Sequence, residues 1–362
     1  MMSDGFRVPD YVIVQDAAAP PTQIPYGVRM IGAPLEWPET KGEGIKVAVI
    51  DTGRPNHPDI TVAGAVDFTG SGMDDRRGHG THCAGIIAAN GKILGVAPGV
   101  ELYTLKVFPD SGSTSPEAIA RALDWCVGAG FDIISMSICG PTDDYNMHQA
   151  VKRCHAAGIV MVAAAGNFGR DYGVMYPARY TEVIAVAAVN LDEAPADFSA
   201  YGMELDLAAA GVDVWSTWLG GGYVQLSGTS MACPHIAGAA ALLQGKARRR
   251  LGRKLTPEEI RVALNLYAED LGLPGRDERY GCGVFSFGRL GAADTIQREI
   301  KMWIGRNDYL VNGQQKVMDV APFIREGRTF TPARYVAEGL GAEVGWDERE
   351  QMVTIKGPGV VR

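Results

Sequence analysis

The stretch KVAVIDTG, at residues 46–53, decides the fold of this 362-residue chain. After its first lysine the run is apolar up to Ile50, and a short apolar run of this kind is typical of a parallel strand buried on both faces. Asp51 then lies at the carboxyl end of the strand, where open α/β sheets build their sites. The stretch therefore predicts an α/β sheet with a rigidly held carboxylate at its functional edge.

Two further strings place reactive side chains among small residues. His79 stands between two glycines and opens residues 81–89, whose small and apolar residues have helical spacing, so we expect it to project from a helix start toward the strand ends. Ser230 precedes a second predicted helix, the alanine-rich residues 231–243. Free N–H groups and the positive end of the helix dipole at that terminus can stabilise a developing oxyanion.

An acid, a base and a hydroxyl in the order Asp51, His79, Ser230 predict a serine endopeptidase that acts on protein or peptide substrates. A serine hydroxyl becomes a good nucleophile only when an imidazole takes its proton, and the imidazole must be oriented by a buried carboxylate. Asn167 follows a strand-like run at residues 159–165. Its side-chain amide is predicted to donate to the same oxyanion as the backbone N–H of Ser230.

Two functions from other classes are alternatives to a serine endopeptidase. An α/β-hydrolase esterase would carry its nucleophile in GxSxG and place the serine first, whereas residues 228–232 lack the final glycine and Ser230 comes last. The second alternative is a catalytically silent scaffold that binds or anchors a partner. It stays open at this point because a sequence does not show whether a cleft is open.

These strings resemble the signatures of the subtilisin family of serine proteases, and the resemblance runs from about residue 25 to about residue 293. It implies a doubly wound, mostly parallel sheet flanked by helices, with residues 25–295 as the peptidase domain. Residues 23–37 are similar to the corresponding segment of the intracellular subtilisins in particular.

The resemblance also implies how a substrate binds. Proteases of this family hold the peptide as an added strand, and two segments match their cleft-lining strands: Gly112, Ser113 and Thr114, and Ser137, Ile138 and Cys139. The primary pocket is implied for Ala165, Gly166, Phe168 and Met175. Since Phe168 and Met175 are apolar, we expect a medium or large uncharged side chain before the scissile bond. Cys139 replaces a common glycine and is expected to crowd the cleft.

Residues 1–24 are predicted to form an N-terminal extension, and no large prodomain is expected. The string FRVPDYVIVQ, at residues 6–15, loosely resembles the segment with which intracellular subtilisins cover their own cleft. Val8-Pro9 would then lie across the catalytic groove as a pseudo-substrate, and the alternative is an unstructured tail. The chain shows no signal-like leader and no stretch that could span a bilayer, so a cytoplasmic location is expected.

The sequence also bears on binding of calcium and of nucleic acid. Asp59 matches a calcium-binding aspartate of the family, but the loop at residues 90–93 is shorter than usual and contains a lysine. Because Ca²⁺ takes six to eight oxygen ligands, we expect the tight site to be absent, no cofactor to be required, and any cation to bind weakly near Ala178 and Val183. A net charge of −8 argues against nucleic acid as a partner.

Several polar residues beside the motifs are expected to have no catalytic role. His82 and His235 are interpreted as packed framework residues, and Asp74 and Asp75 as solvated loop residues. The six cysteines have no CxxC spacing, so they are predicted to be free thiols. Cys83 and Cys233 lie in the catalytic strings, where they either behave as small buried hydrophobes or make the site sensitive to oxidation.

Residues 296–362 resemble the small domain named for the N-terminal region of copper amine oxidases. Apolar and polar residues alternate there between the turn signals Asn312-Gly313 and Glu326-Gly327, and residues 332–340 predict one helix, which gives a small α+β domain. No histidine follows His235, so no copper site is expected. The domain is expected either to dock an unknown partner or to act as a structural cap.

Overall fold

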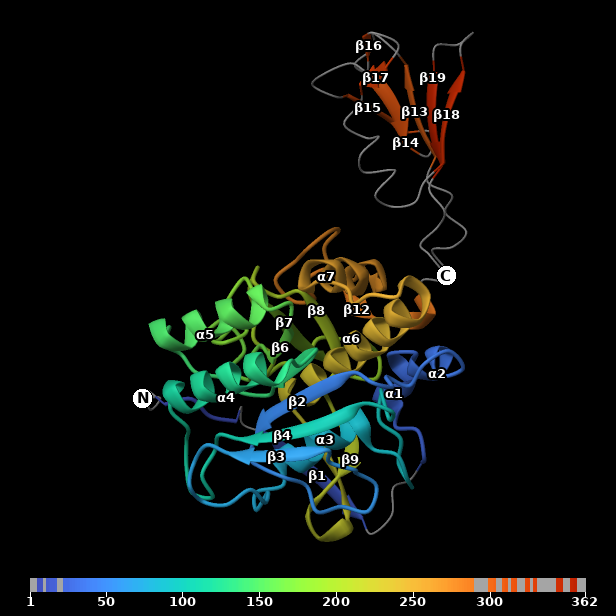
Figure 1. The fold of residues 1–362 in the computed structure, drawn as a ribbon. Helices are drawn as coiled ribbons and strands as arrows, with labels where there is room; N and C mark the ends of the chain where they lie inside the picture. The colour runs from blue at the N-terminus through green and yellow to red at the C-terminus, as the bar shows by residue number, and fades with distance from the viewer. Residues whose placement is uncertain are drawn as a thin grey trace. The chain divides into compact units, whose positions relative to one another are not determined.

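The computed structural model describes residues 5–8, 11–17 and 22–289, together with the strands of the C-terminal region. The chain divides into two compact units, Met1–Gly288 and Arg289–Arg362, each considered by itself (Figure 1). The expected boundary between residues 295 and 296 lies outside the described residues.

A nine-stranded sheet organises the first unit, and its strand order is β11-β12-β8-β7-β6-β5-β2-β4-β3. Its strands are β2 (Lys46–Asp51), β3 (Gly64–Asp67), β4 (Glu101–Lys106), β5 (Ile133–Met136), β6 (Val160–Ala164), β7 (Val183–Val189), β8 (Leu207–Ala210), β11 (Ala268–Glu269) and β12 (Val284–Phe285). All neighbours are parallel except β11 and β12. The predicted mostly parallel sheet is confirmed. The strand order reverses at β2, which lies between β4 and β5, so Asp51 ends the strand at the switch point, where open α/β sheets bind their ligands.

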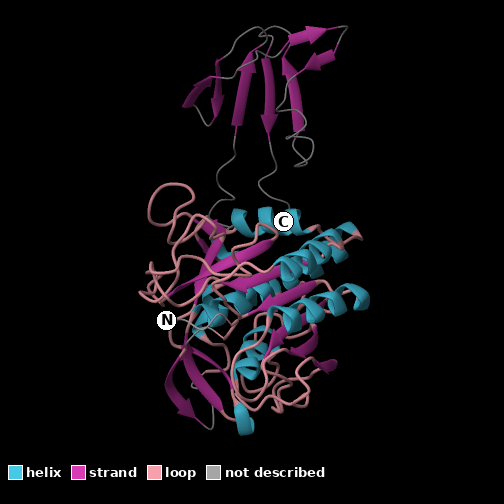
Figure 2. Cartoon of the chain, turned by 90° about the vertical axis from the view of Figure 1, so that its left-hand side faces the viewer, coloured by secondary structure: helices cyan, strands magenta, loops and turns pink. Residues whose placement is uncertain are grey.

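Helices pack on both faces of this sheet (Figures 1 and 2). The helices of this unit are α1 (Tyr26–Met30), α2 (Ala33–Glu36), α3 (His79–Ala88), α4 (Pro116–Ala129), α5 (Tyr145–Ala156), α6 (Thr229–Leu251) and α7 (Pro257–Leu266). Successive residues of β5 point to opposite faces of the sheet. Ile134 packs in a hydrophobic cluster with residues of α4 and α5. The next residue, Ser135, has its hydroxyl 3.6 Å from the Cys233 thiol of α6. The sheet is therefore doubly wound, as predicted.

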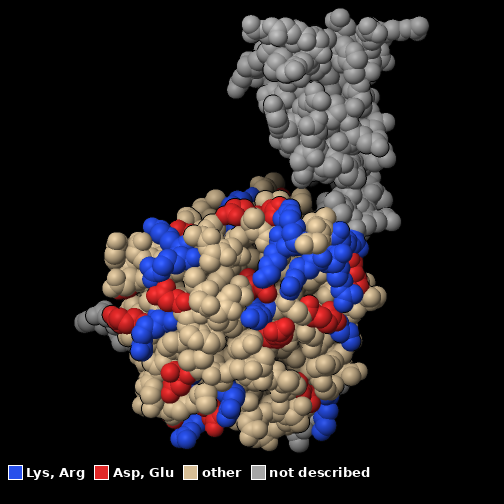
Figure 3. All heavy atoms as spheres, in the orientation of Figure 1, with Lys and Arg blue, Asp and Glu red and all other residues tan. Residues whose placement is uncertain are grey.

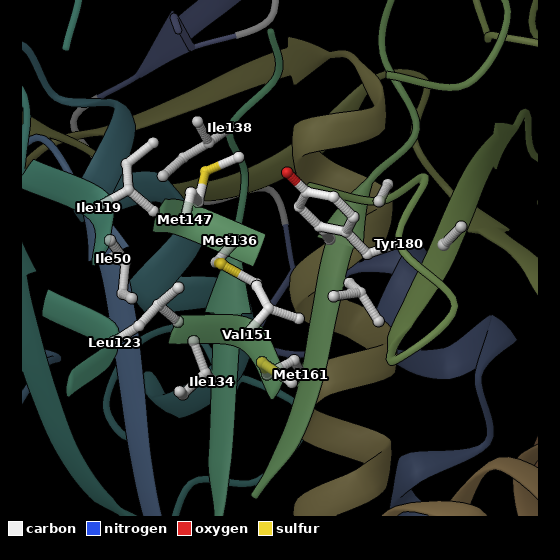
Figure 4. Packing of buried hydrophobic residues seen from close by; sticks show 14 of the residues in the cluster. Ile50, Ile119, Leu123, Ile134, Met136, Ile138, Met147, Val151, Met161 and Tyr180 are labelled. Carbon is white, nitrogen blue, oxygen red and sulfur yellow. The ribbon is translucent and has the colours of Figure 1, made fainter. Parts of the chain in front are cut away.

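The core under α4 and α5 is built from alternate strand residues and the inner faces of these two helices (Figure 4). Met136 and Met161 come from the strands, and Leu123 and Val151 come from the helices; all four are fully buried. Burying side chains of this size contributes about 1.5–3 kcal/mol each. This packing fixes the strand ends on which the site is built.

A second, three-stranded sheet has the order β1-β10-β9 and is antiparallel throughout. Its strands are β1 (Val12–Ala17), β9 (Val214–Thr217) and β10 (Tyr223–Ser227), with a short 3₁₀ turn (Leu219–Gly221) between β9 and β10. The N-terminal extension thus contributes a strand to the peptidase unit, which is more than an unstructured tail would do.

The described part of the second unit consists of strands. An antiparallel sheet has the order β15-β14-β13-β19-β18, and β16 and β17 form a separate pair. The strands are β13 (Glu299–Trp303), β14 (Asp308–Val311), β15 (Gln314–Val317), β16 (Phe323–Arg325), β17 (Arg328–Phe330), β18 (Glu343–Asp347) and β19 (Met352–Lys356). Both predicted turn signals separate paired strands. The predicted helix at residues 332–340 lies outside the described residues.

Charges of both signs occur on the face drawn in Figure 3, and Lys and Arg gather at its upper right. The basic end of α6 is neutralised locally, since Lys246 pairs with Glu36, Arg249 with Glu43 and Arg250 with Glu39. Within the described ranges, no helix is long and apolar enough to cross a membrane.

Candidate functional site

The acid and the base lie at the carboxyl edge of the sheet. Asp51 is the last residue of β2, and His79 is the first residue of α3. The Nδ1 atom of His79 is 2.8 Å from Asp51 Oδ1 and 3.0 Å from Oδ2, and the backbone N–H of Thr52 also donates to Oδ1 at 2.7 Å. A carboxylate held in this way fixes the orientation and tautomer of the imidazole and leaves Nε2 for a substrate-side proton.

Ser230 is the second residue of α6, at the helix terminus where the sequence placed it. Its carbonyl accepts a hydrogen bond of 2.8 Å from the hydroxyl of Ser137, one of the predicted cleft residues. Its Oγ is buried and makes no hydrogen bond with any residue that the structure describes. A hydroxyl held on a rigid helix with its oxygen uncommitted is available to a reacting carbonyl.

Asn167 lies beside this helix terminus, and Thr229 fixes its side chain. The backbone N–H and the hydroxyl of Thr229 both donate to Asn167 Oδ1, at 2.9 and 2.7 Å. The amide nitrogen is consequently turned toward Gly228, where an added Cβ would come within 2.9 Å of Nδ2. This is the orientation that a donor to an oxyanion beside Ser230 needs.

Gly166 shapes the turn that carries Asn167 away from β6. Its φ of +114° is in the region that favours glycine, and a Cβ there would meet the Met175 side chain at 3.2 Å. Met175 is buried against this turn, while Phe168 stacks edge-on with Tyr172. The backbone of Met175 donates to the carbonyl of Ala165. The four residues of the implied primary pocket are therefore brought together.

Asp75 is a site residue that the sequence reasoning missed, because it was expected to be a solvated loop residue. It is buried, and its Oδ1 accepts from the N–H groups of Arg77 and Gly78, both at 2.9 Å. Its Oδ2 accepts from the N–H and the hydroxyl of Thr81, at 2.8 and 2.7 Å. The carboxylate thus caps the start of α3, the helix that presents His79. In the sequence, only the position of Asp75, four residues before His79, could have indicated that it caps this helix.

The N-terminal extension lies between the two segments predicted to line the cleft. Thr114 donates to the carbonyl of Phe6 at 2.9 Å, and Arg7 exchanges two backbone hydrogen bonds with Cys139, at 2.9 and 2.8 Å. Extension and cleft are antiparallel on both sides. The Cys139 side chain is buried and does not prevent this pairing, contrary to the expected crowding.

Side chains of the extension fill the cleft on either side of these bonds. Phe6 is 1% exposed and packs so closely on Gly140 that a Cβ there would lie 2.7 Å from its ring. The Arg7 guanidinium lies 4.7 Å from the centre of the Phe168 ring, and the Tyr11 ring lies 5.2 Å from that of His79. Pro9 lies outside the described residues. Asp51, His79 and Ser230 are at most 1% exposed in this arrangement.

The remaining predicted cleft residues differ in their contacts. The Ile138 side chain is fully buried in the core beside Met147 (Figure 4), so only its backbone is placed at the cleft. The Gly112 carbonyl accepts from Arg77 at 2.8 Å, and Gly5 of the extension approaches Ser113.

Comparison with known proteins identifies the family. Residues 42–283 match the subtilase family, and residues 292–355 match the copper amine oxidase N-terminal domain. The chain belongs to the subtilase family. It is 44% identical to the thermostable alkaline protease of Halalkalibacterium halodurans over 253 residues, which is 68% of each chain. It is 42% identical to subtilisin DY of Bacillus licheniformis, over 69% of this chain and 93% of that one. It is also 42% identical to the intracellular serine protease of Paenibacillus polymyxa, over 71% of this chain and 83% of that one.

A subtilase with this degree of identity to subtilisins is a serine endopeptidase. The esterase alternative is thereby removed, and nothing in the fold or the comparisons favours a silent scaffold.

The candidate calcium ligand of this subtilase accepts hydrogen bonds from protein donors at one of its two carboxylate oxygens. Asp59 is buried, and its Oδ2 accepts from the Ile93 N–H at 3.0 Å and from the Tyr223 hydroxyl at 2.8 Å. Burial and the neighbouring carboxylate both raise the pKa of the Tyr223 hydroxyl, which remains a donor. At the second candidate position, Arg261 donates to the Val183 carbonyl at 2.9 Å.

The framework residues of this subtilase behave as predicted. The Nε2 atom of His82 contacts the carbonyls of Val214 and Val224, and burial lowers its pKa to about 3, so the ring is neutral. Burial likewise lowers the pKa of His235 to about 4. The six cysteines are free thiols, and five of them are buried. Burial raises the pKa of Cys83 well above its usual value, which keeps this neighbour of His79 protonated.

Proposed function

We propose that Ser230, His79, Asp51 and Asn167 carry out peptide-bond hydrolysis. The Ser230 Oγ attacks the scissile carbonyl while His79 Nε2 takes its proton, and Asp51 stabilises the imidazolium that forms. The backbone N–H of Ser230 and the amide of Asn167 stabilise the oxyanion. His79 then protonates the leaving amine. In the second half of the reaction His79 takes a proton from water, the water oxygen attacks the acyl carbonyl, and His79 returns the proton to the Ser230 Oγ as the acyl group leaves. The observation that carries this proposal is the 2.8 Å contact between His79 Nδ1 and Asp51, beside a buried, uncommitted Ser230 hydroxyl.

The test is labelling with a serine-directed fluorophosphonate after the extension has been cut off and removed, because Ser230 is fully buried while the extension covers the cleft. The label reports an assembled nucleophile without a substrate. Ser230→Ala is expected to abolish both labelling and peptide hydrolysis while the far-ultraviolet circular dichroism stays unchanged. Ser71→Ala, in a loop away from the three strings, serves as the matched serine control. Labelling that persisted in Ser230→Ala would assign the nucleophile to another residue.

We propose further that the extension inhibits its own cleft. The support is the antiparallel pairing of Phe6 and Arg7 with both cleft-lining segments and the near-complete burial of His79 and Ser230. A strand held in this way occupies the path that a peptide substrate would take. Val8 is buried with Phe6. Proline at the following position is suited to resist cleavage because it lacks an N–H and its φ is fixed.

A full chain with a recognition site for a specific protease inserted at residues 18–21 tests this proposal. Cutting after folding and removing the excised peptide should raise activity on a short peptide, and adding the peptide back should inhibit competitively. The same chain left uncut is the control. Equal activity before and after removal would leave the extension without an inhibitory role.

We infer an apolar preference before the scissile bond from Phe168 and Met175. Neither side chain carries a charge that could form an ion pair with a Lys or Arg side chain, and Met175 is polarizable and buried. A peptide library cleaved by the cut enzyme should show Leu, Met, Phe or Tyr at this position. A dominant preference for Arg or Lys would contradict the assignment.

We also propose that catalysis requires no calcium. The support is the donor set at Asp59, where a hydroxyl and an N–H supply the positive ends of dipoles. Removing calcium with a chelator should leave activity and melting temperature unchanged, whereas a bound ion would make the melting temperature rise with calcium concentration.

We propose that the protein is located in the cytoplasm. The similarity to an intracellular serine protease and the free thiols support a cytoplasmic location. The net charge of −8, together with the ion pairs of Lys246, Arg249 and Arg250 at the end of α6, argues against nucleic acid as a partner. The copper amine oxidase N-terminal domain is proposed to dock a protein partner.

A further inference from the structure

Lys106 is the only lysine or arginine that is buried among the residues that the structure describes, and its side chain is 1% exposed. It is the last residue of β4, and in the parallel register between β2 and β4 it lies opposite Asp51. Burying a charge is unfavourable unless the charge is paired and hydrogen-bonded, and a methionine would fill similar space without that penalty. A lysine at this position therefore indicates a role other than packing.

The ammonium group of Lys106 joins two loops. Its Nζ donates to the Asp74 carbonyl at 2.8 Å and to Asp110 Oδ1 at 2.6 Å. Asp74 lies in the loop between β3 and α3, whereas Asp110 lies in the loop between β4 and α4, which also contains the predicted cleft residues 112–114. Lys106 thus fastens the loop before the catalytic helix to the end of the strand that neighbours β2.

Both polar ends of the peptide group that precedes Asp75 are fixed. Its carbonyl, from Asp74, accepts from Lys106, and its N–H, from Asp75, donates to the Arg54 carbonyl at 2.9 Å. Gly53 packs directly against this group, since a Cβ there would lie 2.8 Å from Asp74 C and from Asp75 N. Because a peptide group is planar, fixing both ends sets the direction in which the Asp75 side chain leaves the backbone.

We propose that Lys106 is a positioning residue for the catalytic histidine. By holding the Asp74 carbonyl, it aims the Asp75 carboxylate at the N–H groups that begin α3, the helix that presents His79. This inference rests on the proposed function, in which His79 is the base. The side chain of Asp74 has no part in it, because that carboxylate pairs with Arg54 at the surface. Lys106 acts through Asp75 on proton transfer and not on the binding of a peptide.

The test replaces Lys106 with methionine, which is similar in length and has no N–H donor. In the cut enzyme, from which the extension has been removed, Lys106→Met is expected to lower kcat on a short peptide about tenfold and to leave KM within about twofold, because a small displacement of His79 slows proton transfer without altering the peptide site. The rate of fluorophosphonate labelling of Ser230 should fall with kcat. Lys152→Met, at an exposed position of α5, is the matched control and should leave both rates unchanged.

A double substitution shows whether Lys106 acts through Asp75. If it does, Lys106→Met combined with Asp75→Ala should have the kcat of Asp75→Ala alone, because the cap that Lys106 aims is already absent. Lys106→Gln, whose amide nitrogen lies one bond short of the position of Nζ, repeats the measurement with a polar side chain if the methionine variant does not fold. Circular dichroism at the assay temperature shows which variants are folded.

Two outcomes would overturn the proposal. One is a kcat within about twofold of the parent enzyme in the folded Lys106 variant. The other is a double variant in which the separate losses of Lys106→Met and Asp75→Ala multiply, since Lys106 would then act independently of the cap. Both are measured against the parent cut enzyme, so a parent that is not labelled at Ser230 would contradict the proposed function and is distinguished from either outcome.

Discussion

At the scale of single residues, substitution of Asn167 tests whether its side-chain amide donates to the oxyanion. Asn167→Leu should lower kcat by about 10²–10³-fold with little change in KM, a cost known for the loss of such a donor in subtilisin itself. The reason is that the amide acts on the oxyanion, which exists only in the transition state. Steady-state kinetics of the cut enzyme on a short peptide measures it.

Asn167→Asp separates donation from packing. An aspartate can still accept from the Thr229 N–H and hydroxyl, as Asn167 does at 2.9 and 2.7 Å, but it presents no N–H to the oxyanion. Its kcat should therefore fall as far as that of the leucine variant. An aspartate variant with near-normal kcat would remove Asn167 from the oxyanion site.

At the scale of elements, the cap of α3 is expected to support catalysis through His79. Asp75→Ala leaves three N–H groups, two of them buried, and the buried Thr81 hydroxyl without their acceptor, and each buried loss costs about 1–3 kcal/mol. Because a small displacement of the catalytic helix moves His79, kcat should fall about ten- to hundredfold. Kinetics and thermal unfolding of the same variant measure both effects.

Asp74→Ala is the matched control for this prediction. Its carboxylate is exposed and pairs with Arg54 at the surface, where an ion pair contributes about 0–1 kcal/mol. It should leave kcat and the melting temperature almost unchanged. If Asp75→Ala behaved like Asp74→Ala, the cap would have no part in placing His79.

The same elements show what the sequence could predict. Strand β2 and helices α3 and α6 were predicted with their reactive residues in place, because a short apolar run and runs of small residues are local signals. Asp75 was not, since its hydrogen-bond partners depend on how a loop meets a helix. Strand β1 was missed for a related reason: its partner β10 lies more than 200 residues away in the sequence, and register between such distant segments is set by tertiary packing.

At the scale of the whole molecule, two buried neutral histidines should make stability fall in acid. The folded pKa values of His82 and His235 are about 3 and 4, below the unfolded value near 6.5. Above pH 6.5 both states are neutral and nothing is lost. Below it the unfolded chain binds protons that the folded chain does not, so the free energy of unfolding should drop by about 4 kcal/mol between pH 7 and pH 5 from these two groups.

Urea unfolding of the Ser230→Ala chain, which cannot digest itself, measures this loss. His82→Gln keeps a donor for the carbonyls of Val214 and Val224 but has no titrating group. In the Ser230→Ala chain, the additional substitution His82→Gln should remove about half of the loss in free energy of unfolding that the two histidines cause, which is about 2 kcal/mol between pH 7 and pH 5. Carboxylates that titrate in both chains cancel in the comparison. Equal pH dependence in the two chains would mean that His82 takes up a proton in the folded state, and its burial would then impose no acid sensitivity on the fold.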